Sequence, residues 1–366
     1  MIPYTRPYLP SREKLDHYID GIYERAWLTN NGELVQELTR RLEEYLGVEN
    51  LLLVANGTLA LQIAYRALGI SEKSHHERVE AITTPFTFIA TASSLKWDGV
   101  KPVFADIDPD TWCLDPTLIE EAITPYTRAI VPVHVFGNAC EVEAIDAIAQ
   151  RHSLKVIYDA SHAFGVTYQG ESLLKHGDAA TLSFHATKLF HSIEGGAIVF
   201  KRKEDLERAK KMINFGITGP ETIEELGINA KMNEFQAAMG LCVLDEMQEN
   251  LELREEIWSR YEKALGALLQ LQSKPQALGY NYAYFPVVFK SEEQVVRVAA
   301  TLKENGMLAR RYFYPSLESV VCLDAQAEQA VSKNIADRIL CLPLFDQLTK
   351  QSQNSIINSI KTELKE

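Results

Sequence analysis

The sequence predicts an α/β fold in which a large domain with a mostly parallel sheet precedes a smaller α+β domain. Short β-branched segments alternate with amphipathic helical segments between about residues 50 and 200. After residue 200 the pattern becomes mainly helical, and the 366 residues of the chain exceed the usual size of a single core. We therefore expect a large domain at residues 1–250 and a small domain at residues 251–366.

Seven segments up to residue 200 have the apolar, β-branched character of strands, at residues 51–54, 81–84, 102–106, 129–133, 154–159, 181–184 and 197–200. Helical spacing separates the first five of them, at residues 58–68, 87–97, 116–123 and 142–151. Helices between consecutive strands predict parallel pairing, with helices on both faces of the sheet.

The remaining chain is predicted to be a helical region followed by the compact small domain. Helices are expected at residues 203–214, 233–268 and 292–305 and after Pro343, and further apolar segments lie at 283–289 and 308–313. A hinge is expected within the long helix, near residues 245–275. Residues 71–78, with two histidines and mixed charge, are interpreted as a solvated loop.

Composition and charge exclude several classes of protein. The formal net charge of −13 argues against a nucleic-acid-binding surface, which needs a basic patch. No apolar run approaches the length of a membrane helix, and the first residues lack the apolar core of a signal peptide. Five scattered cysteines without a CxxC pair are typical of reduced thiols. We expect a cytoplasmic protein that binds neither membranes nor nucleic acid.

Lys188 and Asp159 each end an apolar segment where an isolated charge is costly to bury. A desolvated lysine is a nucleophile that can form a Schiff base with an aldehyde cofactor. A buried carboxylate can hold a pyridine nitrogen in its protonated form, which makes the ring an electron sink. Together the two residues match the requirements of pyridoxal 5′-phosphate.

Three polar or small residues are candidates for a phosphate site. Gly57 and Thr58 open a predicted helix directly after the first strand, where free backbone N–H groups suit a phosphate. Ser183 ends another strand and offers a second hydroxyl. Each also fits an ordinary structural role, as part of a helix cap or as a strand-end serine.

Phe88 and His162 are candidates for contacts with the cofactor ring. Phe88 follows a strand and could stack on a flat heterocycle, although a core phenylalanine fits the same position. His162 lies three residues after Asp159 and could donate to the phenolic oxygen of the ring, although a structural histidine that caps a turn is the favoured interpretation of this residue taken by itself.

Other catalytic motifs are absent from the sequence. No glycines have GxGxxG spacing, and the single P-loop-like glycine pair, Gly165 and Gly170, is followed by Glu171 where a lysine is needed. No HExxH, GxSxG or EF-hand pattern occurs, and the histidines have no metal-ligand spacing. We therefore expect no metal site.

Taken together, these residues resemble the DegT/DnrJ/EryC1/StrS family of nucleotide-sugar aminotransferases. The resemblance runs in order along the chain from about residue 25 to 345. It rests on the segments Asn-Gly-Thr (56–58), Pro-Phe-Thr-Phe-Ile-Ala-Thr (85–91), 102–108, 131–137, Asp-Ala-Ser-His-Ala-Phe-Gly (159–165), Ser-Phe-His-Ala-Thr-Lys (183–188) and 227–238.

The resemblance implies the architecture of pyridoxal-phosphate-dependent transferases of fold type I, and a homodimer whose active sites lie at the subunit interface. It implies that Lys188 is the Schiff-base lysine and later the general base, with Asp159 at the pyridinium nitrogen and His162 at the phenolic oxygen. Phe88 matches the stacking aromatic. The implied phosphate ligands are Gly57, Thr58, Ser183 and, from the neighbouring subunit, Asn229.

The implied reaction passes the amino group of L-glutamate to a nucleotide-linked keto sugar. The segments around residues 213, 229 and 310 resemble the branch that aminates C-4 of dTDP-4-keto-6-deoxyglucose, and His185 fits C-4 enzymes better than the tyrosine of C-3 enzymes. Substrate contacts are expected from His185, Arg310, Arg311 and Tyr314, although a solvated edge explains the arginines equally well. Many relatives carry His-Tyr-Pro where this chain has Phe-Tyr-Pro at 313–315.

Three alternatives remain beside the C-4 aminotransferase. The first is amination at C-3 by the same chemistry. The second is a sugar dehydratase of the family, which carries histidine at the position of Lys188, so the lysine argues against it. The third is a non-catalytic, cofactor-binding regulator, which should have lost part of the set Lys188, Asp159 and Ser183; all three are present.

Overall fold

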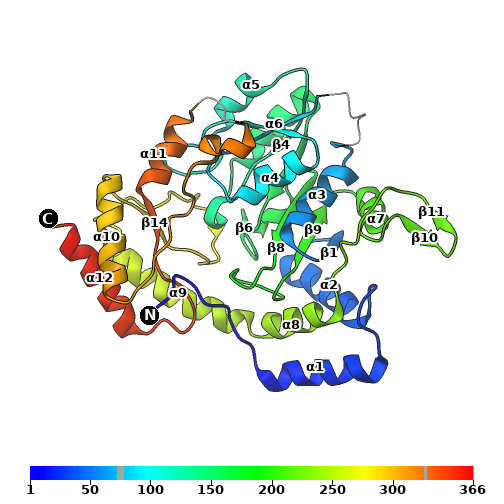
Figure 1. The fold of residues 1–366 in the computed structure, drawn as a ribbon, viewed down its shortest axis with the longest axis horizontal. Coiled ribbons are helices and arrows are strands. Elements are labelled where there is room, and N and C mark those ends of the chain that lie inside the picture. Colours follow the sequence, from blue (N-terminus) through cyan, green and yellow to red (C-terminus); the bar gives the residue numbers. More distant parts are fainter. Residues whose placement is uncertain (72–77, 325–327, 366) are drawn as a thin grey trace.

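The computed structural model describes residues 1–71, 78–324 and 328–365 and has a seven-stranded sheet at its centre (Figure 1). The strand order is β1-β9-β8-β5-β4-β2-β3. The antiparallel strand β9 lies between β1 and β8, and the other neighbours pair in parallel. Each strand lies within two residues of its predicted bounds: β1 (Leu51–Val54), β2 (Glu80–Thr83), β3 (Lys101–Phe104), β4 (Thr127–Val131), β5 (Lys155–Asp159), β8 (Ala179–Ser183) and β9 (Gly196–Phe200). The predicted mostly parallel α/β fold is confirmed.

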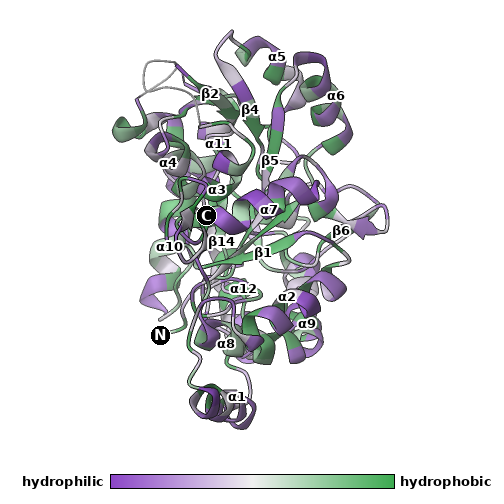
Figure 2. Cartoon of the chain, turned by 90° about the vertical axis from the view of Figure 1, so that its right-hand side faces the viewer, coloured by the Kyte–Doolittle hydropathy of each residue, from purple (hydrophilic) through white to green (hydrophobic). Residues whose placement is uncertain are grey.

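Both faces of the sheet are buried, because side chains alternate along each strand. Leu52 and Val54 of β1 belong to the hydrophobic cluster that contains α3 (Gly57–Ala67), α7 (Lys203–Met212) and Leu95 of α4 (Ile89–Trp97). Leu51 and Leu53 belong to the cluster on the other face, with α2 (Glu33–Leu46), α6 (Val142–His152) and α8 (Glu234–Asp245). Figure 2 shows this as green strands with purple positions on the outer helices.

The predicted long helix at 233–268 is two helices, α8 and α9 (Met247–Leu265), so that prediction was wrong. The break is at Glu246, whose carboxylate accepts hydrogen bonds from Tyr8, Ser11 and Lys14 of the amino-terminal segment. This segment continues into α1 (Arg12–Arg25), which packs on α8. Neither α1 nor α2 was predicted.

The carboxyl-terminal region contains β13 (Pro286–Val288), β14 (Ile339–Cys341), α10 (Glu292–Glu304), α11 (Ala330–Arg338) and α12 (Lys350–Glu363). It has a hydrophobic cluster whose buried members all lie between Ile257 and Ile360. The apolar segment 308–313 forms no regular strand; Leu308 N–H donates to Ile2, and Arg310 forms an isolated bridge with Cys341. The domain boundary at residue 250 and the hinge near 245–275 stay predictions.

Shorter elements complete the fold. The predicted helix at 116–123 is a 3-10 turn (Pro116–Leu118) followed by α5 (Ile119–Ala122). The strands β6 (Thr167–Tyr168), β7 (Glu171–Ser172) and β12 (Leu278–Gly279) form a small sheet. The hairpin β10 (Ile217–Gly219) and β11 (Thr222–Ile223) projects from the body of the molecule (Figure 1). The loop predicted at 71–78 falls almost entirely outside the described residues. None of the described helices combines the length and the apolar character needed to span a bilayer.

Candidate active site

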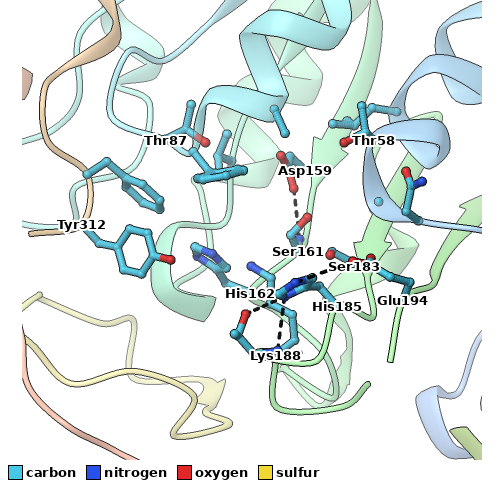
Figure 3. A pocket seen from close by; sticks show the side chains of 18 of the residues that line it. Thr58, Thr87, Asp159, Ser161, His162, Ser183, His185, Lys188, Glu194 and Tyr312 are labelled. Atoms are coloured by element: carbon cyan, nitrogen blue, oxygen red, sulfur yellow. Dashed lines mark hydrogen bonds and ion pairs between the residues drawn. The ribbon is translucent and has the colours of Figure 1, made fainter. Parts of the chain in front are cut away.

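A cavity of about 320 Å³ lies at the carboxyl ends of the parallel strands (Figure 3). This is where ligands bind in open α/β sheets, because the loops that follow the strands converge there. The cavity brings together nine residues that the sequence predicted for a site: Gly57, Thr58, Phe88, Asp159, His162, Ser183, His185, Lys188 and Arg310.

At one end of the cavity, the N-terminus of α3 lies close to the carboxyl end of β8. The side chain of Asn56 caps α3 by accepting from Leu59 N–H, and the N–H groups of Gly57 and Thr58 lie in the first turn, which has no acceptors within the helix. A Cβ on Gly57 would lie 2.7 Å from Cβ of Ser183. Glycine therefore allows the backbone and the Ser183 hydroxyl to line one concave surface, and this surface fits a phosphate group.

We expect Gly57→Ala to weaken cofactor binding. The added methyl group has to displace Ser183, and overpacking of this kind costs about 1–3 kcal/mol, or roughly a factor of ten or more in affinity. Absorbance titration of the cofactor-free protein measures this change. Gly21→Ala in α1 is the matched control, because its methyl group meets only the flexible end of Arg25. Unchanged affinity in the Gly57 variant would contradict the phosphate assignment.

Asp159 is a buried carboxylate at the end of β5, with 5% of its surface exposed. Its Oδ2 accepts a hydrogen bond of 2.7 Å from the Thr91 hydroxyl, and its Oδ1 accepts from Ser161 N–H at 3.1 Å. Thr91 in turn lies 2.9 Å from the Thr87 hydroxyl. These contacts fix the carboxylate at the cavity wall, where it can face a protonated ring nitrogen.

His162 is buried beside this carboxylate and is held in one tautomer. Its Nδ1 accepts a hydrogen bond from Phe136 N–H at 3.1 Å, so a neutral ring carries its proton on Nε2. Burial and the nearby charge of Lys188 lower the pKa of His162 well below its usual value. The residue is therefore a neutral Nε2–H donor, as contact with a phenolic oxygen requires.

Lys188 follows the β8 end in the same loop and reaches the cavity from below in Figure 3. Burial lowers the pKa of Lys188 to about 8, and the negative charge of Asp159 opposes part of this shift. The amine Nζ donates to the hydroxyl of Tyr284 at 3.4 Å, across 96 residues of sequence. A pKa near neutrality makes the amine available both as a nucleophile and as a base.

We expect the reactivity of Lys188 to rise as the pH passes through about 8, because only the neutral amine attacks an aldehyde. The rate at which cofactor-free protein takes up the cofactor, measured by absorbance between pH 6 and 10, checks this. Between about pH 8 and the ordinary pKa of a lysine, Lys188 is protonated more fully in the unfolded chain than in the folded protein. The contribution of Lys188 to the stability of the folded state therefore increases with pH in this range. An uptake rate independent of pH would contradict the lowered pKa.

Phe88 and His185 also lie at the cavity. Phe88 is the N-cap residue of α4 and is 48% exposed, which leaves its ring free for a stacking contact. His185 Nδ1 accepts from Thr187 N–H at 3.2 Å, and its Nε2 lies 3.7 Å from Glu194. The roles predicted for both residues stay predictions.

Three predicted residues lie outside this cavity. Arg311 is turned away by hydrogen bonds to Glu292 and to the carbonyl of Asp337, and Tyr314 packs on its guanidinium at 3.4 Å. Asn229 is exposed and forms an isolated bridge with Asn214. The sequence predicts that Asn229 binds the cofactor phosphate of the neighbouring subunit. Its position outside the cavity of its own subunit therefore does not test that prediction.

Sequence reasoning missed several residues of the site. Thr91, which holds Asp159, lies on α4 and ends the segment 85–91, but the sequence assigned it no role. Glu194 lines the cavity and immediately precedes the Gly195-Gly196 pair that follows the lysine, a position that could have drawn attention to it. Tyr4 and Tyr312 also line the cavity, although they lie far apart in the sequence. No group of three or more potential metal-ligating side chains occurs within the described residues.

A lysine with a lowered pKa, a buried carboxylate and a helix N-terminus beside a serine hydroxyl, all at the carboxyl edge of this sheet, are the features of a pyridoxal-phosphate-dependent enzyme of fold type I. The model of the DegT/DnrJ/EryC1/StrS aminotransferase family matches residues 11–361. The chain belongs to this family, and its cofactor is pyridoxal 5′-phosphate.

Relatives and solved structures agree with this assignment. The chain is 42% identical to a dTDP-4-amino-4,6-dideoxy-D-glucose transaminase of Shigella dysenteriae, over 98% of this chain and 97% of the relative. It is 38% identical to a protein of the same name from Escherichia coli, over 96% and 95% of the two chains. The crystal structure of DesI in the presence of its TDP-sugar product superposes with a TM-score of 0.91 at 32% identity, over 98% of this chain and 92% of that one.

Proposed function

We propose that this protein transfers the amino group of L-glutamate to the C-4 keto group of dTDP-4-keto-6-deoxyglucose. The product is dTDP-4-amino-4,6-dideoxyglucose, made in the cytoplasm for a surface polysaccharide or another glycoconjugate. One observation carries the proposal: Lys188, whose pKa is lowered, lines the same cavity as Asp159 and the concave surface formed by Gly57 and Ser183. The names of the two curated relatives support the choice of sugar.

The cavity offers groups suited to each part of the cofactor. Gly57, Thr58 and Ser183 would bind its phosphate, Asp159 would pair with its ring nitrogen, and the Nε2–H of His162 would donate to its phenolic oxygen. When bound, pyridoxal phosphate supplies an aldehyde that takes up amino groups and a ring that accommodates negative charge. Asp159 supports the second property by keeping the ring nitrogen protonated.

Lys188 moves the proton that the reaction requires. Its neutral amine removes the proton from the α-carbon of glutamate and returns one at the cofactor, and it does the reverse during amination of the sugar. A pKa of about 8 suits this role, because a base is most effective when its pKa lies near the working pH. Tyr284 lies within hydrogen-bonding distance of the amine and orients it.

The working form is proposed to be a homodimer with shared active sites. Several apolar side chains on and after the projecting hairpin are exposed, and such a surface is typical of a protein interface. The strongest cases are Ile223 at 72% and Leu226 at 77% exposure. Asn229 follows in the same segment and would reach the cofactor phosphate of the partner.

The function is tested by incubating the holoenzyme with L-glutamate and either the 4-keto or the 3-keto dTDP-6-deoxysugar. We expect turnover of the 4-keto sugar and an amine located at C-4 by NMR of the product. An amine at C-3 would overturn the choice of substrate and leave the family assignment intact. Elimination of a hydroxyl group without amination would indicate a dehydratase, and turnover of neither sugar would overturn the proposal.

A further inference from the structure

We infer that Arg310, held between Tyr4 and Tyr312, is the receptor for an oxyanion of the substrate, and that Tyr4 is its positioning residue. The inference rests on the proposed function in one respect, namely that both substrates are anionic. Glutamate carries carboxylates, and the nucleotide sugar carries a diphosphate. Nothing in the sequence patterns assigned a role to Tyr4.

The three side chains form a clamp at the cavity. The Arg310 guanidinium lies 4.2 Å from the ring centre of Tyr312 and 5.2 Å from that of Tyr4. Arg310 Nη1 donates to the Tyr4 hydroxyl at 3.1 Å, and the two tyrosine hydroxyls lie 3.4 Å apart. Two aromatic faces and one hydrogen bond restrict the guanidinium, so less conformational entropy is lost when it binds an anion.

The backbone on both sides of the clamp is fixed. Residues 2–4 run beside the chain before Arg310, with Ile2 N–H donating to Gly306 and Leu308 N–H donating to Ile2. Tyr4 itself accepts from Leu344 N–H. Arg310 exchanges two backbone hydrogen bonds with Cys341, of 3.1 and 2.8 Å. The amino-terminal segment is therefore part of the wall of the cavity.

The charge of Arg310 is uncompensated within the described residues, where no carboxylate forms an ion pair with it. Its neighbour Arg311 differs, because its guanidinium pairs with Glu292 at 2.8 Å. Arg310 is exposed and lines the cavity, so its unpaired donors are available to a ligand. Guanidinium donors match the geometry of carboxylate and phosphate oxygens.

The clamp lies away from the phosphate cradle of the cofactor. Figure 3 shows Tyr312 on one side of the cavity and Thr58 and Ser183 on the other, with Lys188 between them. Arg310 is therefore placed to bind a substrate whose reacting carbon is at Lys188, rather than the cofactor phosphate.

Two unreactive probes test the inference by calorimetric binding to the holoenzyme. Glutarate presents the carboxylates of the amino donor, and dTDP presents the diphosphate of the sugar nucleotide. We expect Arg310→Gln to weaken at least one probe about tenfold, since a hydrogen bond to a charged group is lost. Tyr4→Phe keeps the ring but removes the hydroxyl, and should weaken the same probe by about threefold to tenfold. Arg151→Gln, an exposed arginine of α6 that pairs with Glu120, is the control.

Each outcome decides a part of the inference. Loss of glutarate binding alone identifies the carboxylate, loss of dTDP binding alone identifies the diphosphate, and loss of both shows a shared receptor. Full affinity for both probes in Arg310→Gln would overturn the receptor. Unchanged binding in Tyr4→Phe, together with a defect in Arg310→Gln, would overturn the role of Tyr4.

Kinetics with glutamate and the keto sugar complete the test. A positioning role raises the KM for the affected substrate and leaves kcat within about twofold, whereas a loss of folded protein lowers the apparent kcat and leaves KM unchanged. Arg310→Lys retains the charge and should recover part of the affinity, which covers the case in which Arg310→Gln folds poorly. Because the probes do not react, a failure of the proposed amino transfer leaves the binding results interpretable.

Discussion

Lys188→Ala is expected to abolish amino transfer while leaving cofactor binding measurable. The variant loses both the nucleophile that attaches the cofactor and the base that moves the proton, and proton transfer by a positioned side chain alone is worth about 10²–10⁴-fold. The phosphate cradle at Gly57 and Ser183 and the carboxylate of Asp159 remain in place. We therefore expect turnover to fall by at least about 10⁴-fold.

Steady-state turnover and cofactor absorbance together check this result. Lys175→Ala is a suitable control, because Lys175 is exposed and pairs only with Glu171 on the surface. An added small amine should restore part of the proton transfer in the Lys188 variant if the missing base is the cause. Normal turnover by Lys188→Ala would refute the mechanism.

Asp159→Asn is expected to cause the second-largest loss. Asparagine has almost the same shape, and its oxygen can still accept from the Thr91 hydroxyl, but the charge that faces the ring nitrogen is gone. Removing one partner of a buried charge pair costs about 3–5 kcal/mol, which is roughly two to four powers of ten in rate. We expect kcat to fall by about this factor while the protein remains folded.

The same substitution has an effect on pH dependence with a definite sign. The charge of Asp159 raises the pKa of Lys188 against the larger effect of burial, so its removal should lower that pKa further below about 8. The pH profile of cofactor uptake should therefore shift to lower pH. Asp16→Asn on α1, whose partner is the exposed Arg12, is the matched control. A profile that moves to higher pH would contradict the proximity of the two groups.

The sequence predicted that Lys188, Asp159 and Gly57 lie together, for a physical reason. Asp159 ends a strand of the mostly parallel sheet, Lys188 and Gly57 come after the ends of two others, and the carboxyl ends of such strands meet at one edge. Their convergence follows from the strand pattern alone, before any contact between them is known. The strands themselves were found because both of their faces are buried, which produces continuous apolar segments.

The substrate side of the site could not be predicted in the same way. Tyr4 and Arg310 meet across 306 residues, and Tyr284 reaches Lys188 across 96, without any spacing that connects them. Arg310 and Arg311 are indistinguishable in sequence, yet only Arg310 lines the cavity, because Arg311 is held by Glu292. Long-range packing decides these positions.

Misplaced elements have similar causes. The helical pattern at 233–268 continues through Glu246, and the break there comes from bonds to Tyr8, Ser11 and Lys14 that the local pattern does not contain. The helix α1 was missed because it is largely polar and buries only Ile22 fully. Its position depends on α8, which lies more than 200 residues away in the chain.

The most direct test of the account is to reduce the holoenzyme with borohydride and to locate the cofactor by mass spectrometry of its peptides. Reduction makes the link between the cofactor and its lysine permanent. We expect a single modified peptide, with the cofactor on Lys188. A cofactor recovered on any other lysine, or no covalent adduct at all, would contradict it.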